Sequence, residues 1–386
     1  MTTHAPPLDF GDPSGLERLR RELRAWLARH PLPERRPDEE PALFLHRWHR
    51  MLHSGGWVGL DVPEEYGGRG LTALHQVAVS DELGACRAPG VPRIGYLAHA
   101  LLEFASHEQR ARLLPRMLAG DDVWCQGFSE PGAGSDLAGM ATHARRSADG
   151  THYTVNGQKL WTSYAQYSDY CLLLARTDRD APAHTSITAF ALPLDRAGVT
   201  VRPLKAANGD DEFCELFLDD VTIEAAERIG AEGDGWRLAM TTVNYERNAL
   251  DTGHLSKYGL LLERLRQELR TREGALPDGL VSAVGRCVVD YQVLVAHARR
   301  RTAERLAGVA AGPESSVDKL LMTRAEQRLY ETALQVLPQE LYDAGGAVYG
   351  EYLYSRAASV YGGTSQIQRN IIAKRLLRLP SASRVS

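Results

Sequence analysis

Residues 126–139 read Gln-Gly-Phe-Ser-Glu-Pro-Gly-Ala-Gly-Ser-Asp-Leu-Ala-Gly, a glycine-rich stretch that directly follows a predicted strand. The apolar residues Val123, Trp124 and Cys125 favour that strand. Glycine allows positive φ and close approach of the backbone, so consecutive N–H groups can converge on an anion or on the polar edge of a ring. The stretch therefore indicates a binding loop for a phosphate or a heterocycle. A solvent-exposed turn, for which Gly, Ser, Pro and Asp are ordinary residues, is the alternative.

The composition predicts a globular chain. Its 386 residues are 44% hydrophobic and 24% charged, and the formal net charge is -4 at pH 7. This length suits two or three packed units. The weak acidity provides no basic surface for DNA or RNA, so we expect no nucleic-acid partner.

The cysteines and the N-terminus bear on the cellular compartment. The cysteines lie far apart, without the paired spacing of a zinc site or a disulfide framework: Cys86, Cys125, Cys171, Cys214 and Cys287. Residues 1–12 carry no basic and apolar signal segment, and no apolar run approaches ~20 residues. We therefore expect a cytoplasmic protein in a reducing compartment, with no metal site and no membrane.

Hydrophobic periodicity divides the chain into helices, then strands, then helices. Apolar residues at helical spacing predict helices over 15–30, 42–54, 72–86, 96–106 and 107–118. A period of two then predicts strands over 123–128, 153–155, 159–163, 170–175, 187–192, 199–204 and 213–218. Helical spacing then returns. A first helical stripe, with Glu246 on its edge, comprises Trp236, Ala239, Met240, Val243, Arg247, Leu250 and His254. Further helices are predicted over 279–308, 315–337 and about 365–379.

This order predicts an α+β fold that is mainly helical, in three domains. We expect an N-terminal helical domain over residues 1–122, a small β-domain over 123–233 and a C-terminal four-helix bundle over 234–386. No β-α-β alternation occurs in the sequence pattern, which disfavours a Rossmann-type dinucleotide site and a nicotinamide cofactor.

Four sequence blocks within this order of domains resemble the FAD-dependent acyl-CoA dehydrogenases. They are Glu-Glu-Tyr-Gly-Gly at 64–68, the glycine-rich stretch at 127–139, Asn-Gly-Gln-Lys-Leu-Trp-Thr-Ser at 156–163 and Tyr-Gly-Gly-Thr-Ser-Gln-Ile-Gln-Arg at 361–369. Each block alone is weakly specific. Together, with matching order and spacing, they extend the resemblance over about residues 55–380, and they imply the fold of that family.

The resemblance implies that FAD lies against two of these blocks. The residues that would line the flavin are Gln126, Gly127, Phe128, Ser129 and Ser135 on one side, and Trp161, Thr162 and Ser163 on the other. In the family, a hydroxyl at the Ser163 position hydrogen-bonds the flavin N5 region, and the aromatic ring at the Trp161 position stacks beside the flavin. A buried structural Trp on a strand is the alternative for Trp161.

The resemblance also implies an oligomer, because the family completes each flavin site with residues of another subunit. The positions in register are Arg272, Gln335, Thr364 and Gln366. The residues after Arg272 and Gln335 depart from the usual motifs and read Glu-Gly-Ala-Leu and Val-Leu-Pro-Gln. We expect a homodimer or homotetramer. A heteromer is the alternative, since the Gly-Gly-Thr ending is similar to an actinobacterial subgroup that oxidises steroid side-chain thioesters and includes heterotetramers.

The chemistry of the family requires a carboxylate that removes the proton α to a thioester carbonyl. The Glu usually found between Tyr and Gly-Thr is replaced here by Gly362. The isovaleryl and long-chain enzymes place the base instead on the first C-terminal helix, directly before an Arg, and this chain has the pair Glu246-Arg247. The resemblance therefore assigns the base to Glu246 and the substrate contacts to Ser135, Asn244, Arg247 and Gly363. A solvated Glu paired with its neighbouring Arg is the alternative.

As a whole, the resemblance implies a dehydrogenase that introduces a double bond into an acyl thioester. The thioester would be carried by CoA or by an acyl carrier protein, and the electrons would pass to an electron-transferring flavoprotein or a similar acceptor. A flavin monooxygenase of the same fold and a non-catalytic subunit of a heteromeric dehydrogenase are the other classes that the sequence leaves open.

Overall fold

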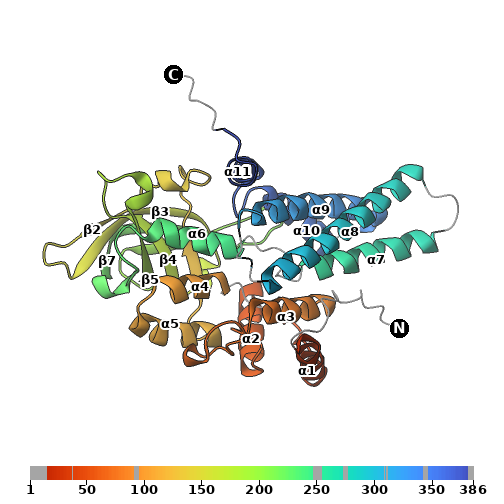
Figure 1. Ribbon diagram of the computed structural model, residues 1–386, viewed down its shortest axis with the longest axis horizontal. Helices are drawn as coiled ribbons and strands as arrows, with labels where there is room; N and C mark the ends of the chain where they lie inside the picture. The colour runs from red at the N-terminus through yellow and green to blue at the C-terminus, as the bar shows by residue number, and fades with distance from the viewer. Residues whose placement is uncertain are drawn as a thin grey trace. The chain divides into compact units, whose positions relative to one another are not determined.

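The computed structural model describes residues 15–36, 38–90, 95–246, 254–272, 277–307, 309, 312–341 and 347–380 (Figure 1). The helices before the sheet are α1 (Leu16–Arg29), α2 (Pro41–Ser54), α3 (Ala73–Ala85), α4 (Gly95–Phe104) and α5 (His107–Ala119). Their ends agree with the sequence prediction to within two residues. Together with the strands and helices that follow, they confirm the α+β, mainly helical class.

Helix α5 begins where its sequence requires. The Ser106 hydroxyl accepts a hydrogen bond from the Gln109 backbone N–H at 3.1 Å, and the Gln109 side chain accepts one from the Ser106 N–H at 2.9 Å. This reciprocal cap satisfies two N–H groups that a helix start leaves unpaired. The helix ends at Gly120, whose φ of 74° is the left-handed conformation that glycine adopts easily.

Helix α1 packs against α3 through an apolar line and a buried cation. Leu16, Leu19, Leu23 and Trp26 are buried at helical spacing. Arg20 is only 2% exposed, and its guanidinium pairs with the carboxylates of α3, at 3.0 Å from Glu82 and 3.4 Å from Asp81. Helix α3 in turn contacts α7 (His254–Thr271), so the N-terminal helix is tied to the C-terminal part of the chain.

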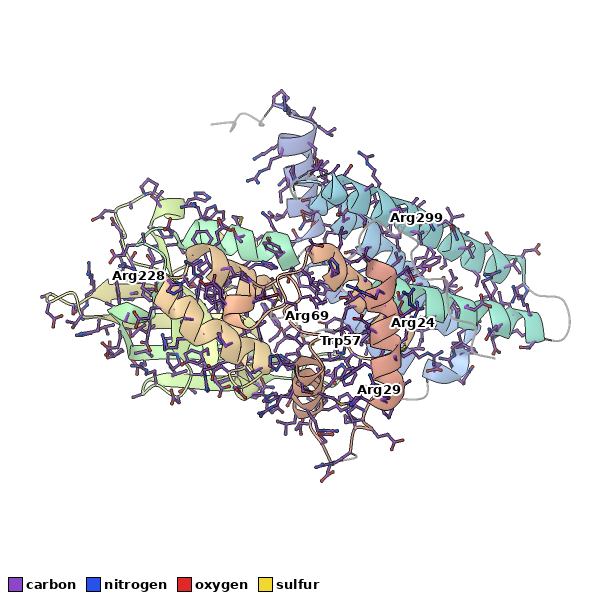
Figure 2. All side chains as sticks on the ribbon, turned by 60° about the horizontal axis from the view of Figure 1, so that its bottom comes forward. Arg24, Arg29, Trp57, Arg69, Arg228 and Arg299 are labelled. Carbon is purple, nitrogen blue, oxygen red and sulfur yellow. The ribbon has the colours of Figure 1, made fainter. Side chains whose placement is uncertain are left out.

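The block at residues 64–68 forms a tight turn after α2. An added Cβ on Gly68 would come within 2.0 Å of the Val62 carbonyl oxygen, so only glycine fits there. The guanidinium carbon of Arg69 lies 5.8 Å from the centroid of the Trp57 ring, a cation–π contact beside this turn (Figure 2). The glycine of this block therefore serves close packing of the chain on itself.

One mixed sheet forms the middle of the chain. Its strands are β1 (Trp124–Gly127), β2 (His143–Arg146), β3 (His152–Ser163), β4 (Tyr170–Arg176), β5 (Ile187–Pro193), β6 (Val199–Leu204), β7 (Phe213–Glu224) and β8 (Arg228–Ile229). They are ordered β6-β7-β3-β2-β4-β5-β8, and β1 pairs in parallel with β4. The sequence missed β2, which is mostly polar, and β8, which has two residues. Both strands form through pairing with distant neighbours.

Strand β3 is one continuous strand where the sequence predicted two. Its pairing with β7 shifts register between Val155 and Gly157 and again between Lys159 and Thr162. At the first shift Gly157 has a φ of 155°, and an added Cβ would lie 2.3 Å from Thr142 Oγ1. The Asn-Gly pair between the two predicted strands therefore lies at a bulge inside one strand.

Replacing Gly157 by Ala is expected to lower the free energy of unfolding by about 1–3 kcal/mol, because the added methyl group collides with Thr142 and the backbone conformation disfavours a side chain. Urea unfolding followed by Trp fluorescence measures the loss. Gly285→Ala is the matched control, since nothing lies within 4 Å of a Cβ at that helical position. Equal unfolding free energies for Gly157→Ala and the parent protein would contradict the assignment.

Helices return after the sheet. They are α6 (Gly235–Glu246), α7, α8 (Asp278–Leu306), α9 (Ser315–Val336), α10 (Ala347–Ser355) and α11 (Ser365–Ile371), which continues into a π-helical turn over Ile372–Leu376. The sequence missed α7 and α10. His254, placed by the sequence at the end of the α6 stripe, is the first residue of α7, whereas Arg247 and Leu250 lie outside the described residues.

Among the described residues, α8 is the one helix long and apolar enough to span a membrane by length and composition. Its residues Val284, Cys287 and Leu294 are buried in the core shared with α7 and α9. A helix of such a core passes the same test, so the sequence of α8 alone does not distinguish a membrane span from a core helix.

The described residues form two compact units that interleave along the chain. One unit contains α2, α4, α5, the sheet and α6 as far as Tyr245, and the other contains α1, α3 and the helices from α7 onward. The domain boundaries predicted at residues 122 and 233 stay a prediction.

Candidate active site

The glycine-rich loop leaves the sheet after β1 and is closed by one buried carboxylate. Glu130, only 7% exposed, accepts hydrogen bonds from the backbone N–H groups of Ala141 at 2.6 Å and Thr142 at 3.0 Å. Its own backbone pairs with Ala133 within the loop. The start and the end of the loop are therefore held together through a single side chain.

A fully buried lysine on β3 completes this anchor. Lys159 Nζ donates to Glu130 Oε1 at 2.8 Å and to the Phe128 carbonyl oxygen at 3.2 Å. Burial opposes ionisation of Glu130, but Lys159 and the hydrogen bonds to the carboxylate outweigh it and hold the pKa of Glu130 below its usual value. Burial lowers the pKa of Lys159, and the Glu130 carboxylate opposes that shift. Each charge thus keeps its partner ionised.

Trp161 projects from the second shift in β3. Its φ of 62° is left-handed, which is rare for a large side chain, and 59% of its surface is exposed. The indole meets the Phe213 ring edge-on, at 5.9 Å between centroids. The alternative of a buried structural Trp is wrong, because the register shift turns this side chain out of the strand.

The two predicted flavin-lining segments lie side by side. The Leu160 N–H donates to the Ser129 carbonyl oxygen at 2.9 Å, which joins the end of β1 to the residue before Trp161. Ser129 and Ser163 are half-buried, Phe128 is buried, and Ser135 is exposed on the loop. The structure therefore brings together the residues that the sequence placed on the two sides of a flavin.

Two buried polar atoms in these segments have no hydrogen-bond partner within the described residues. They are the Oε1 of Gln126 and the Oγ1 of Thr162. A buried polar atom without a partner is costly, so such atoms commonly await a ligand or a water molecule. One carbonyl acceptor and one hydroxyl fit the donors and acceptors along the polar edge of a flavin ring.

Close packing of neighbouring side chains explains why residue 127 is a glycine. An added Cβ would lie 2.6 Å from Cys171 Sγ on β4 and 3.6 Å from Lys159 Cγ. The sequence assigned this residue to close approach by a cofactor. The structure adds that Gly127 makes room for the neighbouring strand and for the lysine that anchors the loop.

Arg272, one of the predicted interface residues, contacts the end of α9 beside a second one, Gln335. The Arg272 guanidinium donates to the Val336 carbonyl oxygen, next to the exposed Gln335. A cation at this end of a helix satisfies a free carbonyl and complements the helix dipole. The structure thus holds Arg272 against the residue that follows Gln335, although the motifs around both residues depart from the family pattern.

The Gly-Gly-Thr segment follows a stretch that α9 holds along its length. Gln327 Nε2 donates to the Ser355 carbonyl at 2.9 Å, and Thr323 Oγ1 donates to the Ala358 carbonyl at 3.2 Å. The Lys319 ammonium lies 3.9 Å from the centroid of the Tyr361 ring. These three α9 residues recur every fourth position, so one helix face fixes the chain up to Tyr361.

Both glycines after Tyr361 are left-handed, with φ of 63° at Gly362 and 93° at Gly363. The amide of the buried Gln368 donates to both of their carbonyl oxygens, at 2.9 and 3.1 Å. Thr364 then caps α11 by accepting the Ile367 N–H at 3.2 Å, and Gln366 is exposed. A glycine at position 362 therefore suits the backbone as well as removing the usual carboxylate.

The proposed base stands at the last described residue of α6. The structure places the backbone of Glu246 there, while its side chain and all of Arg247 lie outside the described residues, and Asn244 is exposed. The buried side of α6 is Leu238, Ala239 and Thr242. The predicted stripe was wrong in part, since Trp236, Met240 and Val243 are only half-buried.

Glu130 and Lys159 lie within the sequence motifs, but their ion pair was not predicted. Asp61 and His99, which pair near the end of α6, were not predicted as site residues. Spacing gave no signal for either pair because the partners are far apart in the chain. Within the described ranges, no group of three or more His, Cys, Asp or Glu residues is arranged to hold a metal ion.

Comparison with known proteins gives matches over almost the whole chain. Three family descriptions match in order: acyl-CoA dehydrogenase N-terminal domain over residues 14–121, middle domain over 125–221 and C-terminal domain over 233–377. The acyl-CoA dehydrogenase IpdE1 of Mycobacterium tuberculosis is 37% identical over 382 residues, which cover 95% of this chain and 98% of that protein.

More distant relatives also match this chain over two thirds or more of its length. The mitochondrial isovaleryl-CoA dehydrogenase of Pongo abelii is 30% identical over 275 residues, which cover 67% of this chain and 64% of that protein. The crystal structure of the ChsE4-ChsE5 complex from Mycobacterium tuberculosis contains a chain similar to this one, with a TM-score of 0.84 and 29% identity over 96% of this chain and 99% of that chain. This chain belongs to the acyl-CoA dehydrogenase family.

Proposed function

We propose that the chain catalyses the FAD-dependent introduction of a double bond into an acyl thioester, with Glu246 as the base. Membership of the family supports the reaction class. In this chain, Trp161 gives the strongest support for a flavin site. Its side chain is 59% exposed, its backbone has a left-handed φ, and it directly follows Leu160, which is hydrogen-bonded to Ser129. Rare backbone conformations of this kind cluster at ligand sites, where they present a side chain that regular structure would bury.

The residues that would line the flavin ring lie on β1, on β3 and in the glycine-rich loop after β1. Gln126 and Thr162 would supply the unpaired Oε1 and Oγ1 to the polar edge of the flavin, and Trp161 would supply an aromatic face. The Lys159–Glu130 pair would keep these groups in place by holding the loop closed. FAD bound there would take up the hydride that leaves the β-carbon of the acyl chain.

Glu246 would remove the proton from the α-carbon. The Cα–H bond breaks, the proton passes to a carboxylate oxygen, and the electron pair becomes the new double bond as the hydride leaves the β-carbon. An apolar pocket would raise the pKa of such a carboxylate and strengthen it as a base. Gly362 leaves no carboxylate at the more usual position, and Ser135, Asn244, Arg247 and Gly363 would contact the thioester.

The carrier and the partners follow from the same proposal. CoA is the carrier that the family supports, and an acyl carrier protein is the alternative. Electrons would leave through an electron-transferring flavoprotein or a similar acceptor. We propose an oligomer in which Arg272, Gln335, Thr364 and Gln366 face the FAD of another subunit. The similar chain in the ChsE4-ChsE5 complex supports a heteromer as readily as a homomer.

Anaerobic mixing of the FAD-loaded protein with a panel of acyl thioesters tests the function. We expect the absorbance of the oxidised flavin to disappear with a subset of the panel, and to persist with matched thioesters that carry two methyl groups and no proton on the α-carbon. The panel contains CoA and acyl-carrier-protein forms of each acyl group, so it also identifies the carrier. Oxygen consumption by the reduced protein distinguishes the monooxygenase alternative.

A protein that takes up no FAD, alone or with a candidate partner chain, would remove the dehydrogenase proposal. FAD uptake without bleaching by any thioester would favour the non-catalytic subunit instead.

A further inference from the structure

Helices α4 and α6 lie side by side in the unit that contains the sheet (Figure 1). Three side-chain pairs, one helical turn apart on α6, join them: Arg237 with Phe104, Thr241 with Glu103, and Tyr245 with His99. The first is a cation–π contact at 5.3 Å, the second a hydrogen bond at 3.2 Å, and the third a stack at 4.1 Å between ring centroids. This row of contacts runs along α6 to the residue before Glu246.

The last pair of the row has the most defined geometry. The rings of His99 and Tyr245 are inclined by only 8° to one another, so the imidazole covers one face of the phenol ring. His99 Nε2 lies 3.0 Å from Asp61 Oδ2, and the two side chains are 18% and 16% exposed. A carboxylate that accepts from one ring nitrogen fixes both the tautomer and the plane of an imidazole. Asp61 therefore sets the surface against which Tyr245 lies.

We propose that Asp61 and His99 are positioning residues for the base at Glu246, an inference that rests on the proposed function. Tyr245 is bonded directly to Glu246, so the stacked rings hold the backbone of α6 at the residue before the proposed base. Among the described residues, the stack is the contact of the row that lies nearest to Glu246.

The effect on the reaction follows from the geometry of proton transfer. The carboxylate oxygen must approach the α-hydrogen within hydrogen-bonding reach of the α-carbon, and a displacement of about 1 Å can cost about 100-fold in rate. Without the stack, the backbone beside Glu246 would be held by fewer contacts and would sample such displacements. Loss of the stack should therefore slow abstraction of the α-proton while binding of FAD and of the thioester stays nearly the same.

Two variants of His99 and one control test this. His99→Leu removes the ring but fills much of its volume, whereas His99→Phe keeps an aromatic face for Tyr245. His184→Leu is the matched control, because His184 contacts the Trp236 ring edge-on at 4.4 Å, at the opposite end of the same helix. Thermal unfolding and FAD titration establish that each variant is folded and binds FAD.

Two rates are measured at saturating thioester. The first is reduction of the bound flavin. The second is exchange of the α-proton of the thioester for deuterium from D2O, in protein whose flavin has already been reduced, so that no hydride is transferred. We expect His99→Leu to lose about tenfold in both rates, with the half-saturating thioester concentration changed less than about threefold, and His99→Phe to stay within about threefold of the parent.

His99→Leu acting at the parent rate, or His99→Phe falling as far as His99→Leu, would overturn the proposal. A loss in His184→Leu equal to that in His99→Leu would also overturn it, because the effect would then not depend on the end of α6. These outcomes are separate from failure of the proposed function, in which the parent protein itself would show neither flavin reduction nor α-proton exchange.

Discussion

Replacing Glu246 by Gln should slow reduction of the flavin by a saturating acyl thioester by about 100-fold or more, since the amide keeps the size of the side chain but cannot take the proton. FAD content should stay the same, because the flavin-lining residues belong to β1, β3 and the glycine-rich loop. Stopped-flow absorbance under anaerobic conditions measures the rate. Exchange of the α-proton in D2O should fall by a similar factor.

Glu22→Gln is a suitable control for this experiment. Glu22 is an exposed carboxylate on α1 that pairs only weakly with Arg18, at 3.7 Å. In the Glu22→Gln variant, the thioester should reduce the flavin at the rate measured for the parent protein. If Glu246→Gln reduced its flavin as fast as the parent protein, the assignment would be abandoned, and the base would have to come from a partner chain.

A carboxylate restored at Gly362 is expected to recover only part of the lost rate. In the Glu246→Gln, Gly362→Glu double variant, a glutamate would have to adopt the left-handed φ of 63° found at Gly362. That conformation costs a non-glycine residue about 1–2 kcal/mol. The backbone there is also held by Gln368. The site of this chain is therefore built around glycine at this position.

Lys159→Met is expected to lower the free energy of unfolding by about 3–5 kcal/mol, because it leaves the Glu130 carboxylate buried without its cation. FAD affinity should fall as well, because the Phe128 carbonyl and the glycine-rich loop lose their shared anchor. Urea unfolding measures the first effect, and titration of the apoprotein with FAD measures the second.

The double variant Lys159→Met, Glu130→Gln separates the cost of an unpaired buried charge from the cost of altered packing. It buries no unpaired charge, so it should be more stable than Lys159→Met alone, although the loop still loses a hydrogen-bond acceptor at Ala141 or Thr142. A Lys159→Met protein with the stability and the FAD affinity of the parent would show that the pair does not anchor the loop.

Much of the fold could be predicted from the sequence because its signals are local. The Ser-His-Glu-Gln pattern at residues 106–109 is typical of a helix start, and both hydrogen bonds of a capping box are present there. The apolar spacing of α1 likewise matches its buried face. The succession of a helical, a strand-rich and a second helical region followed from such periods alone.

The parts that could not be predicted depend on partners distant in sequence. Strand β2 is held by β3 and β4, and its own residues, His-Ala-Arg-Arg, carry no strand signal. Trp161 appeared as one residue of a regular strand, and only the register shift against β7 explains its exposure. The side-chain pairs Glu130–Lys159 and His99–Tyr245 join elements whose spacing in the sequence implies no contact.

The interleaving of the two units has a consequence for synthesis on the ribosome. Helices α1 and α3 emerge early, but α7, which packs against α3, begins only at residue 254. Residues 32–72 and 92–245, which form the other unit, can assemble before that point. Helix α1 can pack on α3 early, but the face of α3 that packs against α7 must wait for the last third of the chain. A nascent chain stopped before α7 would expose that surface to chaperones and proteases.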